Sequence, residues 1–94
     1  MLSYESEDTL DEKFTHSTEI IKNLTERPTN EELLQLYGLF KQSKLGDNNN
    51  PKPGIFDYRQ YKKWDAWNEY KGLNSNAAML QYRKFVYSIK NRYK

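Results

Sequence analysis

Apolar residues recur at helical spacing in four separate stretches of this chain, and this pattern limits its possible folds more than any other feature. Residues that end helices separate the stretches: Pro28 in "TERPTNEE", Gly46 at the start of "GDNNNPKPG", and Gly72. No segment between turn signals alternates apolar and polar residues as a half-buried strand does. The sequence therefore predicts an all-α protein, built as a bundle of four helices.

We expect the helices at about residues 8–24, 30–44, 58–71 and 76–93, with a loop of about ten residues between the second and the third. The second helix can be capped by Thr29 or Asn30, the third by Asp57, and the fourth by Ser75 or Asn76. The fourth has the most regular apolar stripe, which consists of Ala78, Tyr82, Phe85, Val86, Ile89 and Tyr93.

Charge is divided unequally along the chain. Residues 1–40 hold three basic and nine acidic residues, a net charge of −6, whereas residues 41–94 hold twelve basic and four acidic residues, a net charge of +8. A basic half with interleaved aromatics attracts polyphosphates, nucleic acid or anionic lipid, but an acidic half opposes wrapping by a long polyanion. The pattern favours a compact anionic ligand over a nucleic-acid duplex.

The sequence offers little for catalysis. It has no cysteine, and its single histidine, His16, has no second histidine within metal-ligand spacing. The carboxylate pairs Asp11/Glu12 and Glu31/Glu32 fall in first turns of expected helices, where the helix dipole explains them. Glycine-rich phosphate loops are absent from the sequence. We expect no enzyme, no metal site and no cofactor, and the acidic start "MLSYESEDTLDEK" suggests a soluble cytoplasmic protein without a signal peptide.

The stretch "LYGLFKQSKLGD" places aromatic and basic residues together on one edge of the second helix. Tyr37, Lys41 and Lys44 fall within a narrow arc, with Phe40 beside it. Such an edge can be an ordinary boundary between core and solvent, where lysine stems lie across aromatic rings. It can also be a pocket for a flat anionic ligand.

Several short motifs occur together within "PTNEELLQLYGLFKQSKLGDNNNPKPGIFDYRQYKKWDAWNEYKG": a proline with an acidic helix start, Leu-Tyr, Lys-Gln, Gly-Asp, Lys-Pro-Gly and Lys-Trp-x-Ala-Trp. Through them the chain resembles the acyl-CoA-binding protein family. The similarity continues through "NAAMLQYRKFVYSIKNRY" and back to "FTHSTEIIKNL". The resemblance implies a four-helix bundle in up-down-down-up order, with an overhand connection between the second and third helices.

The resemblance also implies a set of residues that bind acyl-CoA. Tyr37, Lys41 and Lys63 match the family residues that hold the 3′-phosphate of the coenzyme A ribose. Tyr82 matches a tyrosine of the fourth helix that contacts the nucleotide head.

Other matched positions are less specific. Lys22 matches a basic position near the ligand, and Leu33 and Leu34 match apolar positions near the acyl chain. Phe40 replaces a frequent tyrosine, so that stacking on adenine can persist while one hydroxyl hydrogen bond is lost. Arg59 replaces a common lysine and can reach phosphate.

From this resemblance we expect a carrier and buffer of medium- to long-chain acyl-CoA, made of an acidic N-terminal extension (residues 1–9) and one acyl-CoA-binding domain (residues 10–94). The expected protein is a monomer that meets membranes and acyl-CoA-using enzymes transiently and binds no nucleic acid. Two alternatives remain open at this point: a helical protein-interaction module, and a module for anionic membrane surfaces, each with a degenerate ligand site.

Overall fold

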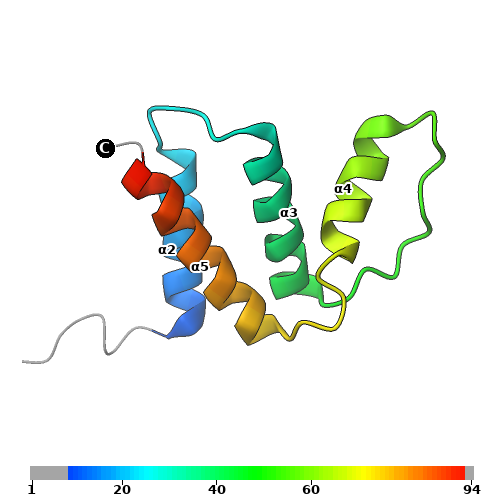
Figure 1. Cartoon of the computed structure of the whole chain (residues 1–94). Coiled ribbons are helices and arrows are strands. Elements are labelled where there is room, and N and C mark those ends of the chain that lie inside the picture. Colours follow the sequence, from blue (N-terminus) through cyan, green and yellow to red (C-terminus); the bar gives the residue numbers. More distant parts are fainter. Residues whose placement is uncertain (1–8, 93–94) are drawn as a thin grey trace, which may run out of the picture.

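The computed structural model describes residues 9–92, which form four α-helices and no strand. Helices α2 and α5 run in one direction, whereas α3 and α4 run in the other and are parallel to each other (Figure 1). The all-α, up-down-down-up prediction is therefore confirmed. Tyr93, which we expected in the apolar stripe of the last helix, lies outside the described residues. The helices are α2 (Leu10–Lys22), α3 (Asn30–Leu45), α4 (Tyr58–Asn68) and α5 (Ser75–Arg92).

The first two helices begin at capping boxes. The hydroxyl oxygen of Thr9 accepts from the backbone N–H of Glu12, and the Glu12 carboxylate accepts from the backbone N–H of Thr9. Thr29 and Glu32 repeat this exchange at the start of α3. Because the box fixes the first turn, α2 begins at Leu10, two residues later than the apolar pattern predicted.

The caps of the last two helices differ from the prediction. Asp57 stands at the N-cap of α4, but its ψ is 69° and its side chain makes no capping bond, whereas the capping threonines have ψ near 160°. Helix α5 is capped by Asn74, whose Oδ1 accepts from the N–H of Ala77 at 2.8 Å. Ser75 and Asn76 are therefore not the cap, because the helix begins one residue earlier than its apolar stripe indicated.

Helix α4 ends at Asn68, three residues before the predicted end. The N–H of Tyr70 donates to the carbonyl of Trp67, and the N–H of Lys71 donates to that of Asn68, so the chain tightens into turns. Gly72 then takes a φ of 88°, a value that favours glycine, and the chain turns toward α5.

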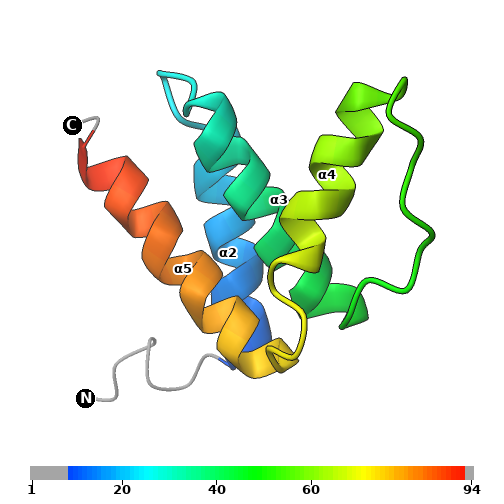
Figure 2. The same cartoon turned by 45° about the vertical axis from the view of Figure 1, so that its right-hand side comes forward.

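The main core lies between α2, α3 and α5. Helix α5 packs against both α2 and α3 (Figure 2) and contributes buried residues to the core. Phe14 is the α2 contribution, and it is 1% exposed. The buried cluster consists of Phe14, Leu36, Leu39, Met79, Tyr82, Val86 and Ile89.

Helix α4 stands at the edge of the bundle and packs against α3 alone among the described helices. The two helices meet at Gly38, where an added Cβ would lie 2.3 Å from the carbonyl oxygen of Ala66. Glycine therefore permits a backbone-to-backbone approach that no other residue allows here.

The long loop between α3 and α4 runs along the outer side of α4 (Figures 1 and 2) and is tied to it by hydrogen bonds. The indole N–H of Trp67 donates to the carbonyl of Gly46, and that of Trp64 to the carbonyl of Asn50, both at 2.8 Å. Asn48 Nδ2 donates to the backbone carbonyl of Trp64 at 3.1 Å. The tryptophans thus hold the loop as well as fill space.

A second set of bonds joins the end of α3 to the turn before α5. Gln42 Nε2 donates to Oδ1 of Asp47 at 2.9 Å and to the carbonyl of Leu73 at 2.8 Å. Asp47 Oδ1 also accepts from the N–H of Gly72 at 2.8 Å, and this bond, with that from Gln42, lowers the pKa of the Asp47 carboxyl. These contacts fix where the α4–α5 connection lies against α3.

Candidate functional site

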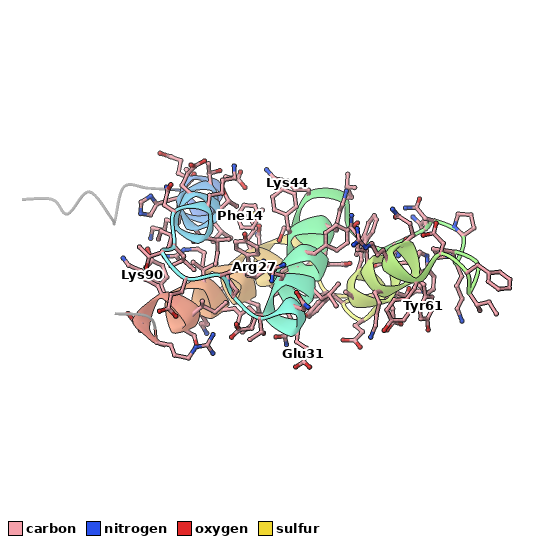
Figure 3. All side chains as sticks on the ribbon, turned by 90° about the horizontal axis from the view of Figure 1, so that it is seen from above. Phe14, Arg27, Glu31, Lys44, Tyr61 and Lys90 are labelled. Carbon is pink, nitrogen blue, oxygen red and sulfur yellow. The ribbon has the colours of Figure 1, made fainter. Side chains whose placement is uncertain are left out.

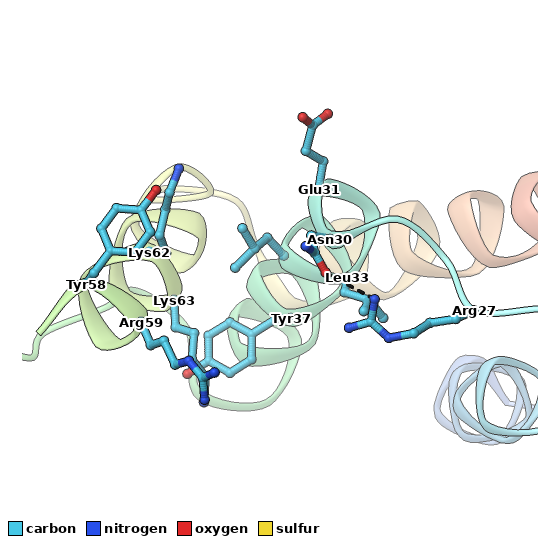
Figure 4. A pocket seen from close by; sticks show the side chains of 10 residues that line it. Arg27, Asn30, Glu31, Leu33, Tyr37, Tyr58, Arg59, Lys62 and Lys63 are labelled. Carbon is cyan, nitrogen blue, oxygen red and sulfur yellow. Dashed lines mark hydrogen bonds between the residues drawn. The ribbon is translucent and has the colours of Figure 1, made fainter.

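An open groove of about 760 Å³ lies between the N-terminal halves of α3 and α4, and Arg27 from the connection before α3 also lines it (Figures 3 and 4). Apolar, aromatic and basic side chains converge there. The residues that line it are Arg27, Asn30, Glu31, Leu33, Leu34, Tyr37, Tyr58, Arg59, Lys62 and Lys63.

Two lysines from different helices flank the ring of Tyr37. Lys63 Nζ, from α4, lies 5.1 Å from the Tyr37 ring centroid, and Lys41 Nζ, one turn further along α3, lies 5.7 Å from it. Lys41 Nζ also lies 5.7 Å from the ring of Trp67. Arg59 extends toward the same tyrosine in Figure 4. The fold therefore brings the three predicted phosphate-binding residues to one place, although Lys63 is far from the other two in sequence.

The positive charge of the groove is not neutralised by its own carboxylate. Glu31 points away from the groove in Figure 4, and within residues 9–92 none of the groove cations forms an ion pair. Arg27 donates instead to a neutral partner, with its Nη1 3.1 Å from Oδ1 of Asn30. The two ion pairs of the described chain lie elsewhere, and they join Lys22 with Glu19 and Arg92 with Glu32.

Leu33 and Leu34, which the family resemblance predicts to lie near the acyl chain, supply the apolar part of the groove. Both side chains are half-buried on α3, and Leu33 lies one turn before Tyr37 on the same face. From Leu33 onward, the α3 side of the groove thus passes from apolar side chains to Tyr37, with Lys41 one turn beyond. This gradient suits an amphiphile whose anionic end lies near Lys41 and Lys63.

Phe40 and Tyr82 do not line this groove. They form an aromatic cluster with Phe14, in which the ring centroids of Phe40 and Tyr82 lie 6.4 Å apart and each lies within 5.7 Å of Phe14. Lys44 Nζ lies 5.4 Å from the Phe14 ring. The residues of the predicted arc therefore face two sides of α3, the groove with Tyr37 and the aromatic cluster with Phe40.

The two rings differ in access. Phe40 is 36% exposed, but Tyr82 is 4% exposed, and burial raises the pKa of the Tyr82 hydroxyl to about 12. Lys22 lies outside both places, at the last turn of α2, where its Nζ is 3.8 Å from a Glu19 carboxylate oxygen. Of the nine predicted residues, five line the groove, and Lys41 adjoins it.

Sequence reasoning missed several groove residues. Lys62 and Tyr58 are one helical turn apart, with Lys62 Nζ 5.5 Å from the Tyr58 ring, and they repeat the spacing of Arg59 and Lys63. This repetition was a usable signal. Arg27 had none, because it lies in an irregular connection that only the tertiary fold brings to the groove.

Within residues 9–92, no group of histidine, cysteine and carboxylate side chains is arranged to hold a metal ion. Among the same residues, no helix is both long and apolar enough to cross a bilayer.

Comparison with known proteins gives a consistent result. Residues 11–86 match the family described as acyl CoA binding protein. The chain is 46% identical over 82 residues to an acyl-CoA-binding protein homolog of Drosophila melanogaster, a match that covers 87% of this chain and 95% of that protein. It is 42% identical over 80 residues to acyl-CoA-binding protein homolog 1 of Caenorhabditis elegans, covering 85% and 93% of the two chains.

Solved structures agree with the sequence matches. The crystal structure of Oryza sativa acyl-CoA-binding protein 2 superposes with a TM-score of 0.85 at 36% identity, covering 89% of this chain and 93% of that one. That of the Moniliophthora perniciosa protein superposes with a TM-score of 0.81 at 32% identity, covering 87% and 81%.

Proposed function

Because the chain belongs to the acyl-CoA-binding protein family, we propose that it binds acyl-CoA thioesters non-covalently and acts as their carrier and buffer. One observation supports this best. Two ammonium groups that form no ion pair, those of Lys41 and Lys63, lie near the ring of Tyr37, in or beside a groove that Leu33 and Leu34 also line. Such a groove complements a ligand with phosphates at one end and a hydrocarbon chain at the other.

The head of the ligand is held by charge. In this proposal the 3′-phosphate of coenzyme A lies against Lys41 and Lys63 and accepts a hydrogen bond from the Tyr37 hydroxyl. Charge-assisted bonds of this kind are shorter and stronger than neutral ones. Arg59 supplies a further cation from α4, and Lys22 contributes a longer-range charge from the end of α2.

The adenine ring is proposed to stack on Phe40. Phe40 is the more accessible ring of its cluster, and Tyr82 lies beneath it as a buried support. An exposed aromatic face next to a cationic edge is suited to a purine that carries phosphates.

The hydrocarbon chain supplies much of the affinity. Each methylene that leaves water contributes about 0.8 kcal/mol, so a medium or long chain over Leu33 and Leu34 outweighs any single phosphate contact. We propose that the protein needs no cofactor, catalyses no reaction and acts as a cytoplasmic monomer. It exchanges ligand transiently with membranes and acyl-CoA-using enzymes and binds no nucleic acid.

Titration calorimetry with three ligands tests the proposal. Palmitoyl-CoA should bind one to one with a negative heat-capacity change, free coenzyme A far more weakly, and palmitate hardly at all. Salt should weaken the head-group contribution but preserve the difference between palmitoyl-CoA and coenzyme A, because apolar burial is not screened. If free coenzyme A binds within about threefold of palmitoyl-CoA, the chain has no site and the carrier function is wrong.

A further inference from the structure

Two large apolar side chains project from the loop before α4 without any cover. Phe56 is 99% exposed and Ile55 is 83% exposed. They are the central residues of a turn, closed by the N–H of Asp57 donating to the carbonyl of Gly54 at 3.0 Å. Turn centres usually carry Gly, Pro, Asn, Asp or Ser, because their backbone preferences or short polar side chains stabilise the turn. This turn instead exposes an isoleucine and a phenylalanine to water, which is unfavourable in free energy. An apolar partner would remove that exposed surface.

Basic residues lie before and after this turn in the sequence. Between residues 51 and 63 there are four basic side chains and one acidic one, Asp57. Lys52 Nζ lies 5.3 Å from the ring of Tyr61, so its stem follows the surface while the ammonium stays in water. The basic side chains of this segment are Lys52, Arg59, Lys62 and Lys63, all exposed.

The turn lies beside the entrance of the ligand groove. It leads directly into the N-terminus of α4, which lies at the same end of the molecule as the N-terminus of α3 in both views (Figures 1 and 2). Tyr58, two residues after Phe56, lines the groove and is itself 64% exposed. An interface that receives the turn would therefore lie next to the groove.

We propose that Ile55 and Phe56 form a tip that inserts into the surface of an anionic lipid membrane, where the surrounding cations contact the headgroups. The tip consists of two exposed apolar side chains, and four of the five charged residues between positions 51 and 63 are basic, which fits a deformable anionic interface better than the shaped pocket of a protein. The inference rests on the proposed acyl-CoA function and deepens it. An acyl-CoA has one chain and dissolves in membranes, so a groove held at the membrane surface can collect or release it there.

Vesicle sedimentation with ligand-free protein tests the tip without using the ligand site. The protein should partition onto phosphatidylcholine vesicles with about one third phosphatidylserine, and much less onto phosphatidylcholine alone. The double variant Ile55→Ser/Phe56→Ser should lower this partition by about tenfold or more. The matched control is Leu45→Ser/Leu80→Ser, which likewise removes two exposed apolar side chains (64% and 43% exposed) but outside the turn, and it should partition like the parent.

Insertion can also be detected directly, because the chain has no cysteine. Phe56→Cys labelled with a polarity-sensitive fluorophore should shift to the blue on the anionic vesicles, whereas labelled Leu45→Cys should not. Equal shifts at both positions, or equal binding of parent and tip variant, would overturn the proposal. So would equal binding to neutral and anionic vesicles.

Calorimetry in the absence of vesicles separates this proposal from the function on which it rests. The tip variant should keep the parent affinity for palmitoyl-CoA, because neither residue lines the groove. If it instead loses about tenfold, Ile55 and Phe56 contact the acyl chain and the membrane role is wrong, although the carrier function stands. If the parent fails to bind palmitoyl-CoA yet partitions as expected, the carrier function fails and the tip remains.

Discussion

The core formed by α2, α3 and α5 and the edge formed by α4 are stabilised in different ways. In the core, side chains such as Phe14 and Ile89 are almost completely buried and pack among one another. At the edge, α4 touches one helix, approaches it backbone to backbone at Gly38, and is held from outside by indole hydrogen bonds to a loop. The groove lies between the two regions. Stability should therefore depend mainly on the core, and ligand affinity on the position of α4.

The strongest test removes core packing. Ile89→Ala should reduce the free energy of unfolding by about 4 kcal/mol, because Ile89 is 0% exposed and its loss leaves a cavity. Urea denaturation measures this change. As long as the variant is folded, its affinity for palmitoyl-CoA should change less than threefold, since Ile89 contacts neither α4 nor the groove. A large affinity loss in the folded variant would mean that the two regions are not separable.

The next test forces the helices apart. Gly38→Ala adds a Cβ that meets the backbone of Ala66, and we expect about 3 kcal/mol of destabilisation. Unlike the core variant, it should also weaken palmitoyl-CoA binding more than tenfold, because Lys63 moves with α4 away from Tyr37. Unchanged affinity would show that the α3–α4 spacing does not set the site. Gly54→Ala, at an open position, is the matched control.

The third test changes the site and leaves both regions folded. Lys41→Ala should weaken palmitoyl-CoA binding by about 10- to 100-fold, the value of a charge-assisted hydrogen bond, and should hardly change the unfolding free energy. An analogue without the 3′-phosphate sharpens the result, because it should bind parent and variant almost equally. A loss of the same size on that analogue would show that Lys41 does not contact this phosphate.

A smaller effect is expected from one bond between loop and edge helix. Trp64→Phe removes the indole N–H that donates to the carbonyl of Asn50, and we expect about 1 kcal/mol of destabilisation. Hydrogen exchange should show that the loss is local, with faster exchange in α4 and unchanged exchange in α5. Equal acceleration in both helices would indicate that edge and core unfold together.

The smallest expected effect is the pH dependence of stability that comes from Glu32, a residue of α3 paired with Arg92 of α5. The hydrogen bond from the Thr29 backbone N–H, and to a smaller extent that from the Arg92 guanidinium, lowers the pKa of the Glu32 carboxyl below 4.5. Because the folded-state pKa is lowered, the carboxylate stabilises the fold above about pH 4.5, and this contribution disappears as the pH falls through the folded-state pKa. Glu32→Gln should cost at most about 1 kcal/mol at pH 7 and nothing near pH 2. The pKa of Asp47 is also lowered, but Asp47 is present in both parent and variant. The difference between their unfolding free energies at each pH therefore reports Glu32 alone.

The sequence was most informative where structure depends on neighbours along the chain. The residue types at positions 29 and 30 predict a helix cap, and the spacing of Val86 and Ile89 predicts a buried helix face; Thr29 is the cap, and both Val86 and Ile89 are buried. Asp57 shows the limit. Its residue type predicts a cap, but the tertiary path of the loop sets its ψ, and the capping bond does not form.

The site was harder to predict because it is assembled from separate segments. The periodicity of α3 places Tyr37 and Lys41 on one edge, but nothing local indicates that Lys63 lies against that edge. That depends on an overhand loop and on Gly38, and only the family resemblance suggested it. The sequence also did not predict that Phe40 lies outside the groove. A helical wheel gives the direction of each side chain around the helix, but it does not show which other helix that side chain meets.

The position of α5 between α2 and α3 affects the order in which the protein can form. Phe14 and Tyr82 are in contact with ring centroids 4.9 Å apart although 68 positions separate them, and Gln42 bonds to a carbonyl 31 positions away. A bundle of antiparallel neighbours can grow hairpin by hairpin, but here the backbone of α2 packs against that of α5, the last described helix, and α3 adds side-chain contacts such as Phe40 on Phe14. During synthesis, we therefore expect the chain to stay unfolded until α5 has left the ribosome, and to fold more slowly than a simple up-and-down bundle of equal length.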